Sequence, residues 1–539
     1  MPRPVELFGQ AASPGIASGP LVWVGRRTGT RRIAGGPEQE KAALAAAIEA
    51  SIASLSVLME AADEEDAAGM LAFQIAMLED ETLSAPALEA IALGSPADAA
   101  WEAALAPQVA EYEAAEDDYF RARASDLKDL RDRVLRHLSG ETGENRPKGA
   151  ILAGEDASPT LFLETDWSEG GGLVLSEGSI NSHVAILARA RGVPMVVGVG
   201  AIDPAPDAEA IVNGTCGRVI LNPDAAAKAE AWADAEAERQ VSEQATRYLA
   251  RPAATADGTP VKVLINVAGP QDVERIDPVS CDGIGLMRTE FLFRDGEAFP
   301  DEDTQYRAYR KLLEWAGTRP VTIRTLDIGG DKPIKGLTVE GEANAFLGVR
   351  GIRLSLKRPE VFRVQLRALA RAAVHGTLKV MWPMVTVPEE LDEARALFEE
   401  SLAGLKARGV PAARPPLGMM VEVPAAAITP ERFSAAEFFS IGSNDLLQYV
   451  AAASRDNGAV ASLAEASLPA VLALIGGLAE HARKRGIEVS ICGDLAGDPM
   501  AASPLLKAGL RSLSVAPVAL ARVKAAVAQV HLGSVHDAA

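Results

Sequence analysis

Eight short apolar runs alternate with helix-type segments along the second half of the chain, and this alternation restricts the possible folds more than any other feature of the sequence. The runs cover residues 261–264, 283–286, 321–325, 379–384, 418–421, 438–441, 489–491 and 512–515. Each run has the length and composition of a buried strand. Strands and helices that alternate in this number predict a parallel (β/α)8 TIM-type barrel over residues 255–539.

Polar and charged side chains directly follow several of these predicted strands. Because the active sites of (β/α)8 barrels lie at the C-terminal ends of the strands, these positions are candidates for a functional site. They are Arg288, Arg324, Glu422, Asn444, Asp445 and Cys492.

The residue types at these strand ends point to a site for an anion and a metal ion. Arginine binds phosphate or carboxylate groups through paired hydrogen bonds. Glu422 and Asp445 offer the carboxylate oxygens that Mg2+ prefers in combination with substrate oxygens. Ordinary ion pairing at the barrel mouth is the alternative, and it explains a single arginine more easily than the whole set.

One histidine in the first half of the chain stands at a predicted strand-to-helix boundary. Residues 172–176 have the pattern of a strand, and the apolar residues 184, 187 and 188 follow His183 at helical spacing until Gly192. Amide donors and the positive end of the helix dipole at such a position favour a dianionic phosphoryl group on the imidazole. The alternative is a simple helix cap by Ser182, followed by a histidine without a catalytic role.

The composition of the first half changes twice. Residues 1–36 and 148–224 contain short strands and turns, with an opening strand, tight turn and second strand before residue 25. Residues 37–147 are rich in Ala, Leu, Glu, Asp and Arg, and they predict several antiparallel helices. We therefore expect one α/β domain, 1–36 plus 148–224, that is interrupted by a helical insertion, 37–147. The Ala- and Glu-rich residues 225–254 predict a linker helix.

Charge and cysteine content limit the possible partners and compartments. The chain of 539 residues has 53 Lys and Arg against 74 Asp and Glu, a net charge of −21. This charge argues against nucleic acid or an anionic membrane as the main partner and suits a basic protein. The three cysteines are far apart in sequence, which indicates neither a disulfide framework nor a zinc site. Without a recognisable leader or apolar membrane span, we expect a soluble cytoplasmic protein.

Beyond these patterns, the chain resembles the Enzyme I family of the bacterial phosphoenolpyruvate-dependent sugar phosphotransferase system. The resemblance runs nearly end to end. It is carried by residues 12–17, 77–80, 118–129, 182–183 and 188–189, and in the barrel by residues 282–291, 324–332, 346–348, 422–425, 441–445 and 492–493.

The resemblance implies a phosphoenolpyruvate-protein phosphotransferase. Phosphoenolpyruvate would transfer its phosphoryl group to His183 in a swivelling phosphohistidine α/β domain, and pyruvate would be released. The phosphoryl group would then pass to a small HPr-type phosphocarrier protein docked on the helical insertion. The family also implies a homodimer formed through the barrel, and a linker that lets the histidine move between barrel and carrier.

The resemblance also implies roles for residues at the barrel mouth. Glu422 and Asp445 would bind Mg2+, Asn444 would contact the phosphate, and Cys492 would protonate the enolate carbon. The residues that would bind phosphoenolpyruvate are Arg288, Arg324, Arg350 and Arg455.

The chain departs from the family pattern at several positions. The family segment Gly-Gly-x-Thr-Ser-His is replaced here by residues 178–183, in which Ser179 adds a Cβ and Asn181 replaces a hydroxyl. These changes alter the expected loop geometry. Ser158 stands where a family hydroxyl steadies the histidine. Ser454 replaces an Asp, and Asp494 replaces a Glu.

Two rival interpretations belong to other classes. Pyruvate phosphate dikinase and phosphoenolpyruvate synthase share the histidine domain and the barrel, but they carry a large ATP-binding domain in front, and the region before residue 148 shows no P-loop. A non-catalytic interaction protein is the second rival, which only the altered histidine segment supports. The joint presence of Glu422, Asp445, Cys492 and the arginines favours an enzyme.

Overall fold

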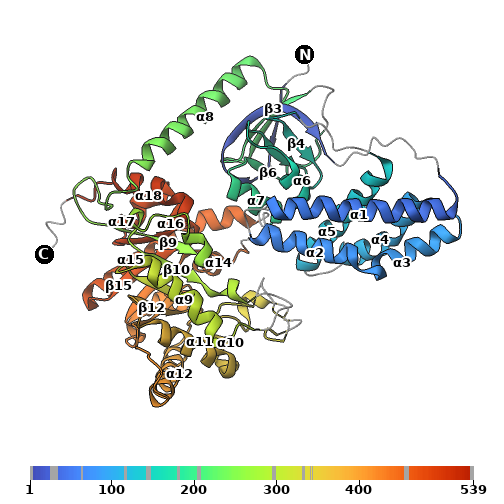
Figure 1. Ribbon diagram of the computed structural model, residues 1–539. Coiled ribbons are helices and arrows are strands. Elements are labelled where there is room, and N and C mark those ends of the chain that lie inside the picture. Colours follow the sequence, from blue (N-terminus) through green and yellow to red (C-terminus); the bar gives the residue numbers. More distant parts are fainter. Residues whose placement is uncertain are drawn as a thin grey trace. The chain divides into compact units, whose positions relative to one another are not determined.

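A computed structural model describes most of the chain, in two compact units, Met1–Arg239 and Gln240–Ala539 (Figure 1). The described residues are 4–24, 34–61, 65–113, 118–140, 147–178, 182–202, 208–293, 299–329, 334, 336–339, 342, 344–454 and 460–533.

The second unit contains a closed barrel of eight parallel strands. The strands are β9 (Lys262–Val267), β10 (Ile284–Arg288), β11 (Val321–Arg324), β12 (Leu378–Trp382), β13 (Leu417–Val421), β14 (Phe438–Gly442), β15 (Glu488–Cys492) and β16 (Ser512–Val515). They pair in sequence order, and β16 pairs with β9 to close the ring. Every predicted run overlaps one strand, so the prediction of a (β/α)8 barrel is confirmed.

The register of the strands brings their last residues to one end of the barrel. Arg288 at the end of β10 pairs with Arg324 at the end of β11. Gly442 at the end of β14 pairs with Cys492 at the end of β15. Side chains that are distant in sequence therefore meet at the C-terminal mouth of the barrel.

Helices cover the outside of the barrel (Figure 1). On α9, the apolar residues Tyr309, Leu312, Leu313 and Ala316 recur at helical spacing and are buried. The helices of this unit are α9 (Glu302–Ala316), α10 (Ile352–Lys357), α11 (Pro359–Ala372), α12 (Pro388–Ala407), α13 (Pro424–Ile428), α14 (Ser443–Ala451), α15 (Ala461–Arg485), α16 (Asp494–Gly497), α17 (Ala502–Lys507) and α18 (Leu520–Val527).

The first unit contains an eight-stranded sheet in the order β1-β8-β7-β3-β4-β5-β6-β2. Its strands are β1 (Val5–Phe8), β2 (Gln10–Ser13), β3 (Ile16–Trp23), β4 (Ile151–Gly154), β5 (Gly172–Leu175), β6 (Met195–Val197), β7 (Glu209–Asn213) and β8 (Arg218–Leu221). The opening strands thus share one sheet with the strands that follow residue 150. Strands β3 to β6 run parallel, and the remaining pairs are antiparallel.

The opening of the chain forms three strands instead of the predicted two. Only Gly9 separates β1 from β2, yet β1 pairs with β8 and β2 pairs with β6, at opposite ends of the strand order. The sheet therefore curls until its two ends meet at this residue. A Cβ on Gly9 would lie 2.4 Å from the Val197 carbonyl oxygen, so a glycine is required where the backbones approach.

Between β3 and β4 the described chain forms a group of packed helices with a core of its own. They are α1 (Pro37–Ala61), α2 (Glu65–Glu79), α3 (Glu81–Ala92), α4 (Ala97–Glu113) and α5 (Asp118–Ser139). Leu44, Leu55 and Trp101 are fully buried in this core. Helix α5 is tied to α6 (Pro159–Glu164) of the sheet region, because Thr160 Oγ1 donates to Asp129 at 2.6 Å.

One helix in the described part of the chain is long and apolar enough to cross a membrane, by length and composition. It covers Pro37–Met59 in α1, with a mean hydropathy of 1.8. The expectation that the chain has no apolar stretch of this length was therefore wrong by these two criteria, because this stretch contains many alanines and few charged residues. Leu44 and Leu55 on this helix pack into the helical core.

Helix α8 (Ala225–Thr246) follows the sheet and corresponds to the predicted linker helix. It ends at Thr246, and residues 247–250 form turns, so the regular helix is shorter than the segment 225–254. Most of its side chains are exposed, as its polar composition indicates.

Candidate functional site

The predicted arginine at the end of β11 lies in a buried cluster at the barrel mouth. Arg324 Nη1 is 2.9 Å from Asp327 Oδ2, and its Nη2 is 3.2 Å from Glu290 Oε1. The backbone N–H of Asp327 donates to the same Glu290 oxygen at 2.8 Å. Arg324 Nε and Glu290 Oε2 are buried without a hydrogen-bond partner among the described residues. Both side chains therefore keep unused hydrogen-bonding capacity.

Arg350 is the most fully bonded side chain of the cluster. Its Nε and Nη2 donate to Asp327 at 3.2 and 2.9 Å. Its Nη1 and Nη2 donate to Asp445 at 3.2 Å each, and Nη1 also donates to the Tyr449 hydroxyl at 3.4 Å. A guanidinium has five N–H donors, and these five bonds occupy all of them. Arg350 can bind a ligand only by exchanging one of these partners.

Glu422 directly follows β13 and is 1% exposed. Its Oε1 accepts a hydrogen bond from the backbone N–H of Met384 at 2.6 Å. Met384 has a φ of 58°, a left-handed conformation that is costly for a residue with a side chain. This strained backbone turns the N–H toward the carboxylate and fixes its position.

Burial raises the pKa of Glu422, and the neighbouring carboxylates Asp445 and Asp327 raise it further. Arg324 and Arg350 oppose this shift without cancelling it. Among the described residues, the buried cluster contains four carboxyl groups (Glu290, Asp327, Glu422 and Asp445) and two guanidinium groups, so negative charge adds to the effect of burial.

The donor set of this cluster fits a divalent cation that takes part of its coordination from a ligand. Carboxylates crowded in a buried site are relieved by a bound dication. The described residues contain no group of three or more His, Cys, Asp or Glu side chains arranged to hold a metal ion. Mg2+ typically uses one or two carboxylates and completes its shell with substrate oxygens and waters. Glu422 and Asp445 meet that requirement.

Arg288 differs from the two buried arginines. It is the last residue of β10 and is half-buried. Among the described residues its guanidinium makes no hydrogen bond or ion pair, so all five donors remain available. Arg288 is therefore the cation of the mouth that is best placed to bind an anion without giving up a partner.

Asn444 is the second residue of α14, next to Asp445, and it is held by the segment that follows β15. Its Nδ2 donates to Asp494 Oδ2 at 3.1 Å, and its Oδ1 accepts from the Asp494 N–H at 2.9 Å. Gly493 has a φ of 94°, and a Cβ there would lie 2.5 Å from Asn444 Oδ1. A glycine is thus required for this close approach. Asp494, where the family has Glu, fixes the amide of Asn444.

Cys492 ends β15 and is 2% exposed. Its Sγ lies 3.4 Å from the Ile441 carbonyl oxygen and 3.8 Å from Ser440 Oγ, among the apolar side chains of the barrel interior. Burial raises the pKa of the thiol to about 11, although the Ser440 hydroxyl and the charges of Arg324 and Arg288 lower it. The group is therefore a protonated thiol at neutral pH.

The histidine segment lies in the first unit. His183 is the first residue of α7 (His183–Arg191), and Ser182 caps the helix by accepting from the Ala185 N–H at 3.3 Å. The helix ends at Gly192, as predicted, and the structure shows this glycine in a left-handed conformation. The His183 side chain and residues 179–181 lie outside the described part of the chain. Ser158 caps α6 and contacts Thr160 Oγ1 at 3.3 Å.

The described site thus brings Arg324, Arg350, Glu422 and Asp445 together. Arg288, Asn444 and Cys492 lie at neighbouring strand ends, and Arg455 lies outside the described residues. Glu290 and Asp327 were missed as site residues in the sequence, although both follow barrel strands by the rule used for the others. Tyr449 was also missed. Its spacing of four residues from Asp445 on α14 was the available signal.

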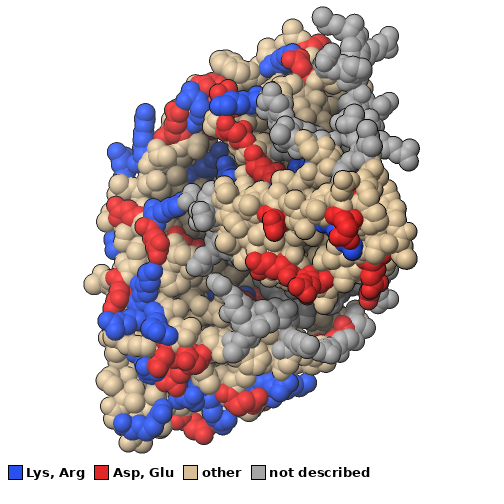
Figure 2. Space-filling model, turned by 45° about the vertical axis from the view of Figure 1, so that its right-hand side comes forward, with Lys and Arg blue, Asp and Glu red and all other residues tan. Residues whose placement is uncertain are grey.

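The charges of the mouth differ from those on the surface. Figure 2 shows acidic and basic side chains interspersed over the visible face, where solvent screens them. Arg350, by contrast, is 5% exposed. Electrostatic effects among the mouth residues are correspondingly stronger.

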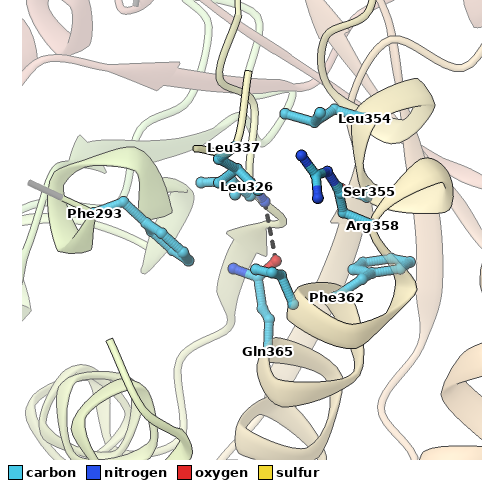
Figure 3. A pocket seen from close by; sticks show the side chains of 9 residues that line it. Phe293, Leu326, Leu337, Leu354, Ser355, Arg358, Phe362 and Gln365 are labelled. Carbon is cyan, nitrogen blue, oxygen red and sulfur yellow. Dashed lines mark hydrogen bonds between the residues drawn. The ribbon is translucent and has the colours of Figure 1, made fainter. Parts of the chain in front are cut away.

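A small, mostly apolar pocket is lined in part by the segment that follows β11 (Figure 3). The side chains of Phe293, Leu326, Leu337, Leu354, Val361 and Phe362 line it. Gln365 Oε1 accepts a hydrogen bond from the Leu326 N–H at 3.0 Å, next to Asp327 in sequence. The pocket therefore belongs to the packing that supports the site loop.

Comparison with known proteins gives three family matches that together span most of the chain. The descriptions are PEP-utilising enzyme, N-terminal (residues 8–123), PEP-utilising enzyme, mobile domain (146–217), and PEP-utilising enzyme, PEP-binding domain (242–532). The phosphoenolpyruvate-protein phosphotransferase of Geobacillus stearothermophilus is 36% identical over 97% of this chain and 93% of its own.

Two further relatives come from other organisms. The phosphoenolpyruvate-protein phosphotransferase of Haloferax volcanii is 38% identical over 88% of this chain and 84% of its own. The multiphosphoryl transfer protein of Rhodobacter capsulatus is 38% identical over 83% of this chain, which corresponds to 54% of that protein.

Proposed function

Because the chain belongs to the family of phosphoenolpyruvate-utilising enzymes, we propose that it transfers the phosphoryl group of phosphoenolpyruvate to His183. The group then passes to a histidine of a small HPr-type phosphocarrier protein, and pyruvate is released. The observation that carries this proposal is the buried assembly of Arg324, Arg350, Glu422 and Asp445 at the barrel mouth. Its guanidinium groups suit a small, strongly anionic substrate once a divalent cation offsets the carboxylates.

The arginines bind the phosphate and carboxylate of phosphoenolpyruvate. Arg288 offers a full set of free donors, and the unpartnered Arg324 Nε offers one more. Arg350 joins by exchanging a partner, and we expect Arg455 to take the same role. Asn444, whose amide is fixed by Asp494, contacts the phosphate.

Glu422 and Asp445 are the residues that hold Mg2+. When bound, the metal ion supplies positive charge that offsets the charge of phosphoenolpyruvate and of the enolate. The excess of carboxylate over guanidinium in the cluster, together with the raised pKa of Glu422, supports this assignment.

Transfer begins when an imidazole nitrogen of His183 forms a bond to phosphorus and the bond from phosphorus to the enol oxygen breaks. The arginines stabilise the enolate that is left. The Cys492 thiol gives its proton to the enolate carbon, which becomes the methyl group of pyruvate, and the thiolate recovers a proton from solvent. A thiol with a raised pKa is in the acid form that this step needs.

The parts of the chain divide this work. Residues 1–36 plus 148–224 carry His183, residues 37–147 dock the carrier, and residues 255–539 bind phosphoenolpyruvate and form a homodimer. His183 has to meet the barrel and the carrier in turn, so the linker of residues 225–254 permits a swivelling motion.

The full-length protein with phosphoenolpyruvate and Mg2+ tests the proposal. We expect pyruvate release and an acid-labile, base-stable phosphoryl group on the peptide that contains His183. His183→Ala removes both signals, whereas the matched control His481→Ala retains them. A phosphoryl group that persists in His183→Ala, or that forms on another peptide, contradicts the proposal.

A further inference from the structure

Asp327 occupies the centre of the cluster at the barrel mouth. Its Oδ2 lies 2.9 Å from Arg324 Nη1 and 2.9 Å from Arg350 Nη2, so one carboxylate oxygen bridges both guanidinium groups. Its Oδ1 accepts from Arg350 Nε at 3.2 Å. Asp327 is 5% exposed, and this burial strengthens each of these contacts.

The two arginines repel each other without an anion between them. Burial lowers the pKa of Arg324, and the charge of Arg350 lowers it too. Glu290, Asp327 and Glu422 more than compensate, so the pKa of Arg324 is raised overall. Asp327 is the one of these three carboxylates that contacts both arginines. It therefore allows two cations to stay side by side before an anionic substrate arrives.

The backbone around Asp327 is fixed on both sides. The Leu326 N–H is held by Gln365, and the Asp327 N–H by Glu290. Gly351 has a φ of 58°, and a Cβ at this position would lie 2.8 Å from Met384 Cβ and 3.1 Å from Asp327 Oδ1. The glycine thus leaves room for the carboxylate, whose position is set by the surrounding chain.

We propose that Asp327 is a positioning residue, which holds the guanidinium groups of Arg324 and Arg350 in the orientation needed for phosphoryl transfer and does not itself touch the substrate. This inference rests on the proposed function. Because Asp327 carries a negative charge near an anion site, its charge opposes substrate binding. Asp327 therefore contributes by orienting the two guanidinium groups, and its removal should affect the catalytic step more than the affinity for substrate.

The experiment compares Asp327→Asn with Glu302→Gln in the full-length protein. Glu302 pairs with Arg367 and Arg371 on the outside of the barrel, so its variant removes a comparable arginine partner away from the mouth. Pyruvate release is measured as kcat and KM for phosphoenolpyruvate, and folding is measured by thermal unfolding. We expect Asp327→Asn to lower kcat about 10- to 100-fold, with KM changed less than about threefold. Glu302→Gln keeps both constants.

A double-mutant cycle identifies the arginines as the route of the effect. If Asp327 acts through Arg350, the kcat loss from Asp327→Asn is several-fold smaller in an Arg350→Lys background. An equal loss in both backgrounds overturns the proposal. A parental kcat in Asp327→Asn, or a loss confined to KM, also overturns it. If the parental protein releases no pyruvate, the proposed function has failed; if only the Asp327 comparison fails, the proposed function stands.

Discussion

The two ends of the barrel carry carboxyl groups whose pKa values are shifted in opposite directions. At its N-terminal end, Glu488 accepts from Lys379 Nζ at 2.5 Å and from Lys262 Nζ at 3.3 Å. Burial raises the pKa of Glu488, but the two lysines outweigh burial and lower it overall. At the C-terminal end, the buried carboxyl groups of the described residues outnumber the buried guanidinium groups, and burial together with the neighbouring carboxylates raises the pKa of Glu422.

At the N-terminal end the carboxylate has enough cationic partners, and we call this the balanced end. At the C-terminal end the described carboxyl groups exceed their cationic partners. Glu488 has 39% of its side chain exposed and more positive than negative neighbours, so it needs nothing further. Among the described residues, the mouth buries more carboxyl groups than guanidinium groups, and such an excess of negative charge does not stabilise the fold. In a (β/α)8 barrel, stability residues gather at the N-terminal end and catalytic residues at the C-terminal end. The charge balance of the two ends follows that division.

The largest expected effect comes from the C-terminal end of β15. Cys492→Ala should lower pyruvate formation by roughly 10²- to 10⁴-fold, because a positioned acid typically contributes that much. The variant should fold, bind phosphoenolpyruvate with near-parental affinity, and still exchange phosphate between His183 and its carrier. Pyruvate assays and calorimetric binding measure these outcomes.

Cys281→Ala is the matched control, since Cys281 is also a buried thiol but lies before β10, away from the mouth. It should keep the parental rate of pyruvate formation. If Cys492→Ala also makes pyruvate at the parental rate, Cys492 is a core residue and the contrast between the two ends of β15 is lost.

Glu422→Gln should have the next largest effect, with activity and stability moving in opposite directions. Pyruvate formation should fall about 10²- to 10³-fold, because a charged group that acts in the transition state is removed. The melting temperature without Mg2+ should stay the same or rise, because a crowded carboxylate disappears. A clear fall in the melting temperature of Glu422→Gln would show that the Glu422 carboxyl group stabilises the fold, which contradicts an excess of negative charge at the mouth.

The fold was predictable from the sequence where local pattern decides. The eight barrel strands alternate with helices, and Gly192 marks the end of α7. The pairing of β1 and β2 was not predictable. These two strands are separated only by Gly9, yet they pair with β8 and β6, which lie about 200 residues later in the chain. Such pairing depends on the curl of the whole sheet.

The site was predictable in its residue types and position, but not in its bonding. Strand ends identified Arg324, Glu422 and Cys492 as neighbours. The bridge made by Asp327 depends on which way side chains point around the ring, and sequence spacing does not specify that direction. The strained φ of Met384 also leaves no mark in the sequence. The roles of the site residues remain predictions.

The pH dependence of stability should have opposite signs at the two ends. The raised pKa of Glu422 means that the folded protein keeps a proton that the unfolded chain loses near the usual value of 4.5. Its contribution to stability is therefore present at low pH and lost as pH rises through the folded pKa. The lowered pKa of Glu488 gives stability above 4.5, which is lost as pH falls through the folded pKa.

Unfolding free energies of the parental protein, Glu422→Gln and Glu488→Gln without Mg2+, measured from pH 4 to pH 9, test these signs. Relative to the parental protein, Glu422→Gln should gain stability as pH rises, by about 1.4 kcal/mol for each unit of pKa difference. As pH rises through the lower part of the range, Glu488→Gln should lose stability relative to the parental protein, because the parental carboxylate ionises there and is stabilised by its two lysines. Difference curves with the same slope would remove the distinction between the two ends.

The smallest expected effect belongs to the N-terminal end of β15 at constant pH. Glu488→Gln removes the partner of Lys262 and Lys379, and it should lower the free energy of unfolding at pH 7 by about 0.2–1 kcal/mol, because exposed ion pairs are partly screened by solvent. The loss should shrink at high salt, where the Debye length is short. Denaturant unfolding at low and high salt measures this loss of stability.

The kcat and KM of Glu488→Gln for phosphoenolpyruvate should stay parental, since the balanced end takes no part in the chemistry. A kcat reduced more than about threefold without a matching loss of stability would contradict this. It would mean that the charges at the N-terminal end of β15 act on Cys492 at its C-terminal end, so that the two ends are electrostatically coupled.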